Sequence, residues 1–179
     1  MDRKSIRFEV LEAHYNDLQR LTARNSFIQI QPVEADPGWP PVKYIITFSC
    51  LGVVGVLDNG MPKVGREHKV LLQLSKDEPH RDPVILWLTE IWHPNIDPDE
   101  PRNVCYNSSQ TWFGSKPLSD LVQSLAEMAT YQRYFAKNEP PFPQNREAAE
   151  WVRNIAEPMG WVRQGEPFDD RGLLKDSKP

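Results

Sequence analysis

Residues 91–118 read IWHPNIDPDEPRNVCYNSSQTWFGSKPL, and this stretch decides how the rest of the chain is organised. It combines the triplet HPN at positions 93–95, a proline-broken acidic loop and a single cysteine, Cys105. An apolar run at 84–88 leads into it, and a periodic helical pattern follows it. Chemistry often occurs in loops that are held between two rigid elements. We therefore expect any active site of this protein to lie in this stretch.

The sequence after the stretch predicts two helices. The first shows apolar residues at three- and four-residue spacing, namely Leu118, Leu121, Val122, Leu125 and Met128. Pro117 suits the first turn of this helix, and Asp120 suits the positive end of its dipole. A stiff connector at 139–143 follows, because its prolines exclude a helix. Asn145 is then expected to cap a second helix, with its apolar residues at Ala148, Ala149, Trp151, Val152 and Ile155.

Before the stretch, the sequence predicts one helix and a four-stranded antiparallel meander. The helix is expected over roughly Ser5–Ala23, where apolar residues recur at helical spacing between charges. The four strands are expected, in chain order, at Phe27–Gln31, Val42–Cys50, His68–Leu74 and Val84–Thr89. Residues 51–66 are ambiguous: the turn signal DNG at 58–60 allows Val53–Leu57 to extend the sheet as a hairpin arm. The fold class is therefore α+β.

We expect a single domain over residues 1–157. A chain of 179 residues is long enough for one domain with a proper core. Beyond Pro158 the periodicity ends, and glycine, proline and charged residues dominate. Residues 158–179 are therefore predicted to form a loosely held C-terminal tail.

Charge and composition exclude several classes of protein. The net charge is −4 and the pI is about 5.6, which does not favour a nucleic-acid groove. The charged N-terminal residues contain no apolar signal core, and no apolar run has the length of a membrane span. Two cysteines do not form a disulfide framework. We expect a soluble cytoplasmic protein that does not bind membranes.

The residues alone leave two interpretations of Cys105 open. A cysteine in a polar loop is either a half-buried thiol or a nucleophile. Cys50, in contrast, ends an apolar strand-like run and is expected to be a small buried hydrophobe. The acidic residues of DPDEP at 97–101 are mixed in type and spaced by prolines, which matches neither zinc nor calcium ligand spacing. No metal and no cofactor are expected.

In order and spacing, the chain resembles the ubiquitin-conjugating enzyme family over roughly Ser5–Ile155. One helix, a meander, HPN, a cysteine, a tryptophan and two helices follow one another as they do in that family. The specific matches are short, and they are His93-Pro94-Asn95-Ile96, Val104-Cys105, Trp112, Pro117-Leu118, and Asn145 with Glu147-Ala148-Ala149. The resemblance implies the ubiquitin-conjugating fold: an N-terminal helix, a four-stranded meander, an active-site loop and two helices.

The resemblance also implies an activity and its residues. Enzymes of the family accept an activated ubiquitin-like modifier as a thioester on a cysteine, here Cys105, and transfer it to an amine such as a lysine. A thiol suits this role because its thiolate is nucleophilic near neutral pH and leaves readily in the next transfer. Asn95 is implied either to stabilise the oxyanion formed on aminolysis or to buttress the loop. The implied partners are a ubiquitin-like modifier and an activating enzyme.

Other residues are implied to support this chemistry. His93 and Pro94 are expected to build the turn, with His93 bonded to the backbone and not acting as a base. Trp92 stands where many relatives carry a tyrosine beside the attacking amine. Trp112 is expected to pack. The family docks its activating enzyme on the first helix, so Arg3, Lys4 and Arg7 form a candidate partner site, although they also fit a solvated face.

The chain also departs from the family. Ten positions separate Asn95 from Cys105, more than is usual, so residues 97–102 form an insertion. The acid expected near the acceptor amine has no clear match; Glu139, Asp99 and Glu100 are candidates. These departures suggest a divergent branch, similar to conjugating enzymes of bacterial ubiquitin-like operons, some antiviral, that also encode a deconjugating metallopeptidase. The alternative function is a non-catalytic binding variant that docks a modifier or scaffolds a complex.

Overall fold

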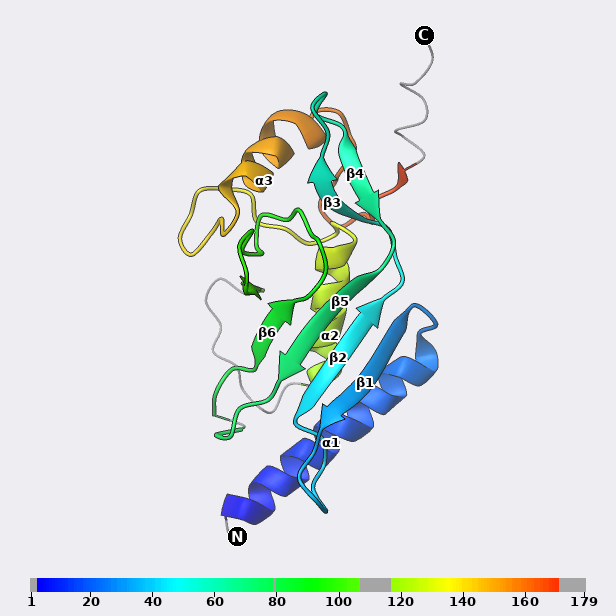
Figure 1. Cartoon of the computed structure of the whole chain (residues 1–179), viewed down its shortest axis with the longest axis vertical. Coiled ribbons are helices and arrows are strands. Elements are labelled where there is room, and N and C mark those ends of the chain that lie inside the picture. The colour runs from blue at the N-terminus through cyan, green and yellow to red at the C-terminus, as the bar shows by residue number, and fades with distance from the viewer. Residues whose placement is uncertain (1–2, 79, 107–116, 171–179) are drawn as a thin grey trace.

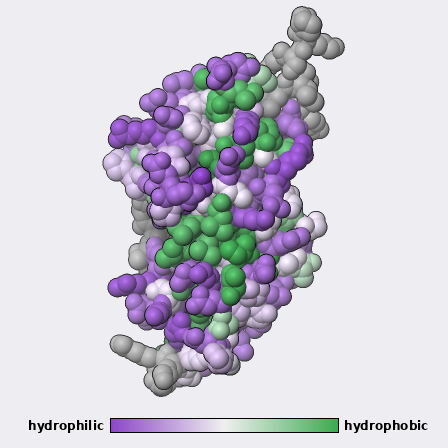
Figure 2. Space-filling model, viewed as in Figure 1, coloured by the Kyte–Doolittle hydropathy of each residue, from purple (hydrophilic) through white to green (hydrophobic). Residues whose placement is uncertain are grey.

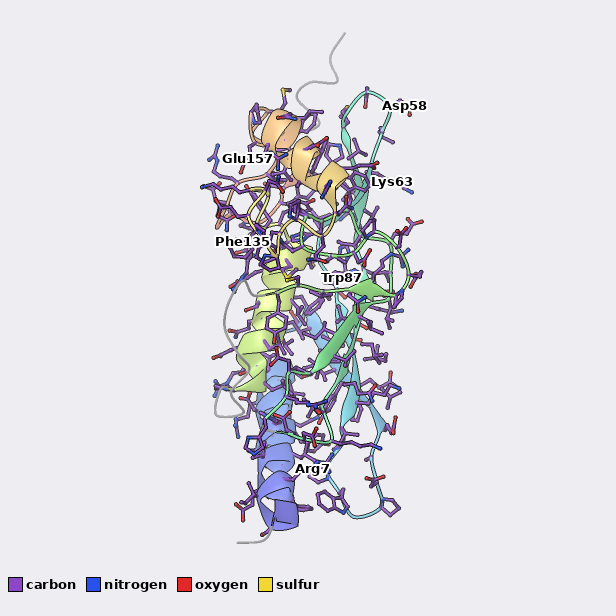
Figure 3. The ribbon with its side chains drawn as sticks, turned by 90° about the vertical axis from the view of Figure 1, so that its left-hand side faces the viewer. Arg7, Asp58, Lys63, Trp87, Phe135 and Glu157 are labelled. Atoms are coloured by element: carbon purple, nitrogen blue, oxygen red, sulfur yellow. The ribbon has the colours of Figure 1, made fainter. Side chains whose placement is uncertain are left out.

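The computed structural model describes residues 3–78, 80–106 and 117–170. Figure 1 shows one antiparallel sheet with two helices behind it and a group of shorter elements at one end. Figure 3, turned by 90°, shows α1 and α2 in one layer and the strands in a second layer. Within the described residues, no helix is both long and apolar enough to cross a membrane.

Helix α1 spans Arg3–Arg24 and covers the predicted helical segment. Leu11 and Leu18 are fully buried on the face that packs on the sheet, as the three- and four-residue spacing predicts. Asp17 on the same helix accepts a hydrogen bond of 2.7 Å from the backbone N–H of Ser119. This bond satisfies one of the free N–H groups at the start of α2 and therefore joins the two helices.

The main sheet has five strands in the order β1-β2-β5-β6-β7. Their bounds are Ile28–Glu34, Lys43–Phe48, His68–Gln73, Val84–Trp87 and Arg102–Asn103. All neighbouring pairs are antiparallel. The four-stranded meander of the sequence prediction is confirmed, and β7 adds a short fifth strand next to β6. This fifth strand comes from the central stretch itself.

The two faces of the main sheet differ. Tyr44, Ile46 and Phe48 point into the core beneath the helices and are fully buried. On the open face, Ile45 pairs with Leu71, and Leu71 pairs with Leu86, so that three apolar side chains line up across the strands. Figure 2 shows an apolar region over the middle of this face.

Residues 52–65 form a separate hairpin instead of a further arm of the main sheet. Strands β3 (Gly52–Val56) and β4 (Pro62–Gly65) pair only with each other. The chain leaves the main sheet at Gly52, where a Cβ would lie 2.4 Å from the carbonyl oxygen of Ala129 and 2.5 Å from Nε2 of His68. Only glycine allows this approach to the end of α2. The hairpin packs with the end of α2 and with α3, since Val53 is buried in one cluster with Tyr131 and Trp151.

Helices α2 (Leu118–Ala129) and α3 (Arg146–Trp151) lie where the periodicity predicts them. The predicted cap of α3 is present, since the Asn145 side chain accepts a hydrogen bond of 2.9 Å from the N–H of Ala148. A π-helix, η1 (Val152–Ala156), continues α3 directly.

The prediction of a loosely held tail is wrong for residues 158–170. Val162 is 3% exposed and Phe168 is 5% exposed, and both belong to a second core with Tyr131 and Trp151. The N–H of Phe168 also donates to the carbonyl oxygen of Thr130 at 2.7 Å. Trp161 also packs against this core, and the N–H of Gly165 donates to the carbonyl oxygen of Gln132 at 2.8 Å. A few apolar contacts and backbone hydrogen bonds therefore hold the segment, although its apolar residues show no periodicity. The division of the chain at residue 157 stays a prediction.

Candidate functional site

The triplet at 93–95 forms a buried turn after β6, and His93 is its hydrogen-bonding centre. His93 is fully buried. Its Nε2–H donates to the carbonyl oxygen of Arg133 at 3.0 Å, and its Nδ1 accepts from the N–H of Asn95 at 3.1 Å. Burial lowers the pKa of His93 to about 3, against a weaker opposing effect of the Arg133 bond. The ring is therefore neutral at pH 7, and both of its nitrogens hold the turn.

Asn95 is held by a pair of hydrogen bonds to one residue. Its Oδ1 accepts from the N–H of Phe135 at 2.8 Å, and its Nδ2 donates to the carbonyl oxygen of Phe135 at 3.1 Å. The residue is only 1% exposed. Because buried amides need partners, this pairing fixes the asparagine side chain and the backbone of Phe135 together.

Pro94 completes the attachment of the turn. Its carbonyl oxygen accepts hydrogen bonds from the N–H groups of Gln144 and Asn145, at 2.8 and 3.0 Å. Each residue of the triplet therefore bonds to the chain beyond α2: His93 and Asn95 to residues 133–135, and Pro94 to residues 144–145. We call residues 131–135 and 144–145 the cradle of the turn.

Cys105 lies directly opposite Asn95 in a narrow antiparallel connection. The N–H of Cys105 donates to the carbonyl oxygen of Asn95 at 2.9 Å, and Ile96 forms a bridge with Val104. The Cys105 side chain is half-buried. The cysteine is thus fixed by its backbone to the turn that the cradle holds.

The insertion at 97–102 extends outward from this connection. The N–H of Asp97 donates to the carbonyl oxygen of Asn103 at 3.0 Å, which closes the base of the loop. Arg102 and Glu100 form an ion pair within the loop. Strand β7 follows and returns the chain to the sheet edge, so the longer loop leaves Asn95 and Cys105 adjacent.

Both cysteines are half-buried, so Cys50 is less buried than the sequence predicts, but the two lie in different surroundings. Burial raises the pKa of the Cys50 thiol to about 11. Cys50 lines a cavity of about 430 Å³ with Phe27 and Gln132. At pH 7 Cys50 is therefore almost entirely the unreactive thiol. Cys105 is the cysteine that adjoins the buried turn.

The remaining predicted site residues are only partly described. Trp92 precedes the turn. Its backbone N–H donates to the carbonyl oxygen of Val53 at 2.9 Å, and its carbonyl oxygen accepts from the hydroxyl of Tyr131. Trp112 lies outside the described residues, as do the side chains of Arg3 and Lys4. Arg7 is half-buried, with its guanidinium 5.5 Å from the ring centre of Trp39. This contact ties α1 to the β1–β2 loop.

Sequence reasoning missed residues 131–135 of the cradle and found Asn145 only as a helix cap. Arg133 and Phe135 act through backbone atoms, so their side-chain types carry no signal of the role. Tyr131 does carry one: its fully buried ring lies 4.9 Å from that of His93. The aromatic segment TYQRYF at 130–135 could have indicated a packed element directly after α2. Within the described residues, no group of three His, Cys, Asp or Glu side chains could hold a metal ion.

Comparisons with known proteins agree with this architecture. No family model matches the chain. A solved structure described as a novel ubiquitin-conjugating enzyme is 19% identical, with a TM-score of 0.59, and the match covers 88% of this chain and 94% of the other. The E2 domain of a Toxoplasma gondii ubiquitin-conjugating enzyme is 21% identical, with a TM-score of 0.53, over 85% of this chain and 88% of the other. The sheet, the helices and the order of the site elements therefore place this chain in the ubiquitin-conjugating fold.

Proposed function

We propose that this protein is a conjugating enzyme that carries a ubiquitin-like modifier as a thioester on Cys105 and transfers it to a lysine amine. One observation carries the proposal. A half-buried cysteine is hydrogen-bonded through its backbone to Asn95, the last residue of a turn whose three residues are all held by the chain beyond α2. The fold neighbours named above support it.

Two transfer steps follow from this assignment. In the first, the Cys105 thiolate attacks the thioester carbonyl of the modifier on its activating enzyme. A new C–S bond forms, the old C–S bond breaks, and the cysteine of the activating enzyme leaves as a thiolate. In the second, a neutral lysine amine attacks the same carbonyl. The C–N bond forms, the bond to Cys105 breaks, and the proton lost by nitrogen balances the released thiol.

We assign Asn95 to positioning, the second of the two roles that the resemblance implies. Its carbonyl oxygen and one of its N–H groups are committed to the backbone of Phe135. The backbone carbonyl oxygen of the same asparagine accepts the hydrogen bond from the N–H of Cys105. Asn95 therefore sets the position of the cysteine backbone, and a direct oxyanion contact requires its remaining N–H.

The proposed partners are the modifier and its activating enzyme. Of the three cations suggested on the first helix, Arg7 lies against Trp39, which leaves Arg3 and Lys4 as the better candidates for contact with the activating enzyme. A cytoplasmic location, a bacterial operon with a deconjugating metallopeptidase, and a part in antiviral defence stay predictions, and the neighbouring genes test the last two.

The test is an intact-mass measurement. The protein is mixed with the modifier, the activating enzyme and ATP. We expect an adduct of the modifier's mass that a thiol reductant removes, and that Cys50→Ala retains but Cys105→Ala lacks. An adduct that persists in Cys105→Ala, or no adduct with the modifier and activating enzyme encoded beside this gene, contradicts the proposal. The second result favours the non-catalytic binding variant instead.

A further inference from the structure

A cavity of about 600 Å³ lies behind the cradle. Its walls come from the continuous segment 134–142, which begins with the cradle residues Tyr134 and Phe135, and from Arg153 of η1, Glu157 and Gln164 of the packed tail. In Figure 3, Phe135 and Glu157 lie on the same side of the molecule, in its upper half, with Glu157 above Phe135. A cavity of this size accommodates a few residues of a peptide.

The floor of the cavity is aromatic. The rings of Phe135 and Phe142 stack, with centroids 4.8 Å apart and an angle of 14° between their planes. Tyr134 adds a third ring, and its hydroxyl donates to Glu157 at 2.7 Å. Burial, together with this carboxylate, raises the pKa of Tyr134, so the hydroxyl keeps its proton. Such a floor favours a large apolar side chain.

The rim carries both signs of charge. Lys137, Glu139, Arg153 and Glu157 line the cavity, and none takes part in an ion pair with another described residue. Two cations and two carboxylates do not favour a polyanion such as a nucleotide. They suit a peptide, which offers charged side chains of both signs along its backbone.

The π-helix places two of these charges. Arg153 lies inside η1 (Val152–Ala156), and Glu157 caps its end. Arg153 donates to the carbonyl oxygen of Ala136, which joins η1 to the segment at 134–142 beside the cavity. π-Helical turns are rare and often occur at functional sites.

Two hydrogen-bonded steps connect the cavity to the proposed nucleophile. Phe135, in the floor, pairs with the side chain of Asn95, and the carbonyl oxygen of Asn95 accepts from the N–H of Cys105. We propose that this cavity is an acceptor pocket, which takes a large apolar side chain of the peptide segment that carries the acceptor lysine. This inference rests on the proposed function, since it names part of the substrate of that activity.

Gln164 offers a variant that fills the pocket. It is exposed, it lines the cavity, and no described hydrogen bond uses its side chain. Gln164→Trp should therefore reduce the space without removing a described contact. Asn154→Trp is the matched control, because Asn154 is exposed on η1 but does not line the cavity. Equal melting temperatures of both variants and the wild type show that neither change alters the fold.

The first arm measures binding and needs no activity. The ¹⁵N-labelled full chain is titrated with the blocked tripeptides Phe-Lys-Gly and Gly-Lys-Gly at millimolar concentration. We expect saturable shifts of the Ala136, Lys137 and residue-164 amides with Phe-Lys-Gly only, in the wild type and Asn154→Trp. Gln164→Trp should lose them. Shifts that do not saturate, or that spread evenly over the surface, overturn the pocket.

The second arm measures transfer from the loaded enzyme to the same peptides and to free lysine. We expect Phe-Lys-Gly to be modified about tenfold faster than Gly-Lys-Gly, the usual effect of one well-placed apolar side chain. Gln164→Trp should remove this preference and leave discharge to free lysine unchanged. Equal rates for both peptides in the wild type overturn the inference while the loading itself upholds the proposed function. If the wild type binds Phe-Lys-Gly but does not load, the proposed function fails and the peptide site remains.

Discussion

Asn95 and Phe135 form a closed pair: the amide of one side chain accepts from and donates to the backbone of the other residue, at 2.8 and 3.1 Å. The two residues are forty positions apart and join the cysteine-bearing loop to the segment after α2. This pair is the clearest physical link between the fold and the proposed chemistry.

The first prediction concerns that pair. Asn95→Ala leaves the N–H and C=O of Phe135 without partners in a buried site, which should lower the free energy of unfolding by about 2–4 kcal/mol. A thermal melt should show a fall in Tm of about 5–15 °C. Transfer to lysine should slow together with this loss of stability, because the backbone that carries Cys105 shifts.

Tm and the transfer rate of Asn95→Ala, measured together, distinguish the two roles of Asn95. Unchanged Tm with slow transfer and normal loading supports a direct oxyanion contact and contradicts the positioning role. Unchanged Tm with unchanged transfer excludes both roles.

The second prediction concerns pH and His93. The unfolded state gains a proton on this histidine below pH 6.5, whereas the native state does so only near pH 3. The native state therefore binds fewer protons between these values, and the free energy of unfolding should fall as the pH drops, by up to about 1.4 kcal/mol per pH unit. Well above pH 6.5, His93 is neutral in both states and takes nothing from the free energy of unfolding. Denaturant unfolding from pH 7.5 to 4 measures it.

The matched variant for this measurement is His93→Gln, which does not titrate. Burial also lowers the pKa of His68. His68 therefore adds the same pH dependence to the free energy of unfolding in the wild type and in the variant. The difference between the two curves should shrink as the pH falls. Parallel curves would show that His93 is not a buried neutral ring.

The third prediction concerns the point where the hairpin leaves the main sheet. Gly52→Ala forces a Cβ to within 2.4 Å of the Ala129 carbonyl oxygen and should cost about 2 kcal/mol or more. Gly55→Ala, in the same hairpin, meets no atom nearer than 3.8 Å and should change stability by less than about 0.5 kcal/mol. Chemical denaturation of both variants compares them, and equal losses would contradict the close approach at Gly52.

The fourth prediction concerns Cys50. With a pKa of about 11, only about one thiol in a thousand is ionised at pH 8, so alkylation by iodoacetamide should be slow. Its rate should rise about tenfold per pH unit from 8 to 10. Peptide mapping after timed labelling follows both cysteines separately. Rapid labelling of Cys50 at pH 7 would contradict the raised pKa of its thiol.

Much of the fold could be predicted because it rests on regular patterns. The helical spacing of Leu118 to Met128 and the four apolar runs of the meander indicate their elements directly. The departure of the chain from the main sheet at Gly52 could not be predicted, because a glycine in an apolar run occurs in continuous strands, bulges and turns alike. The packed tail was missed because its buried side chains, Val162 and Phe168, follow no helical or strand period, and its other contacts are backbone hydrogen bonds.

The sequence singles out the side chains of the candidate site, whose roles stay predictions, but not the backbone groups that support them. The sequence identifies His93, Asn95 and Cys105, because their types and order carry the resemblance. It does not identify Arg133 or Phe135, whose contribution comes from backbone atoms that every residue has. Only the folded chain places those atoms beside the turn.

The central claim is that Cys105 carries the modifier, and Cys105→Ser tests it most directly. A serine hydroxyl attacks the same carbonyl more slowly and forms an oxygen ester, which thiol reductant does not cleave. Intact mass after incubation with the modifier, the activating enzyme and ATP should show a reductant-sensitive adduct in the wild type and a reductant-resistant, hydroxide-sensitive adduct in Cys105→Ser, mapped to residue 105. A reductant-sensitive adduct that persists in Cys105→Ser, at Cys50 or elsewhere, would contradict the account.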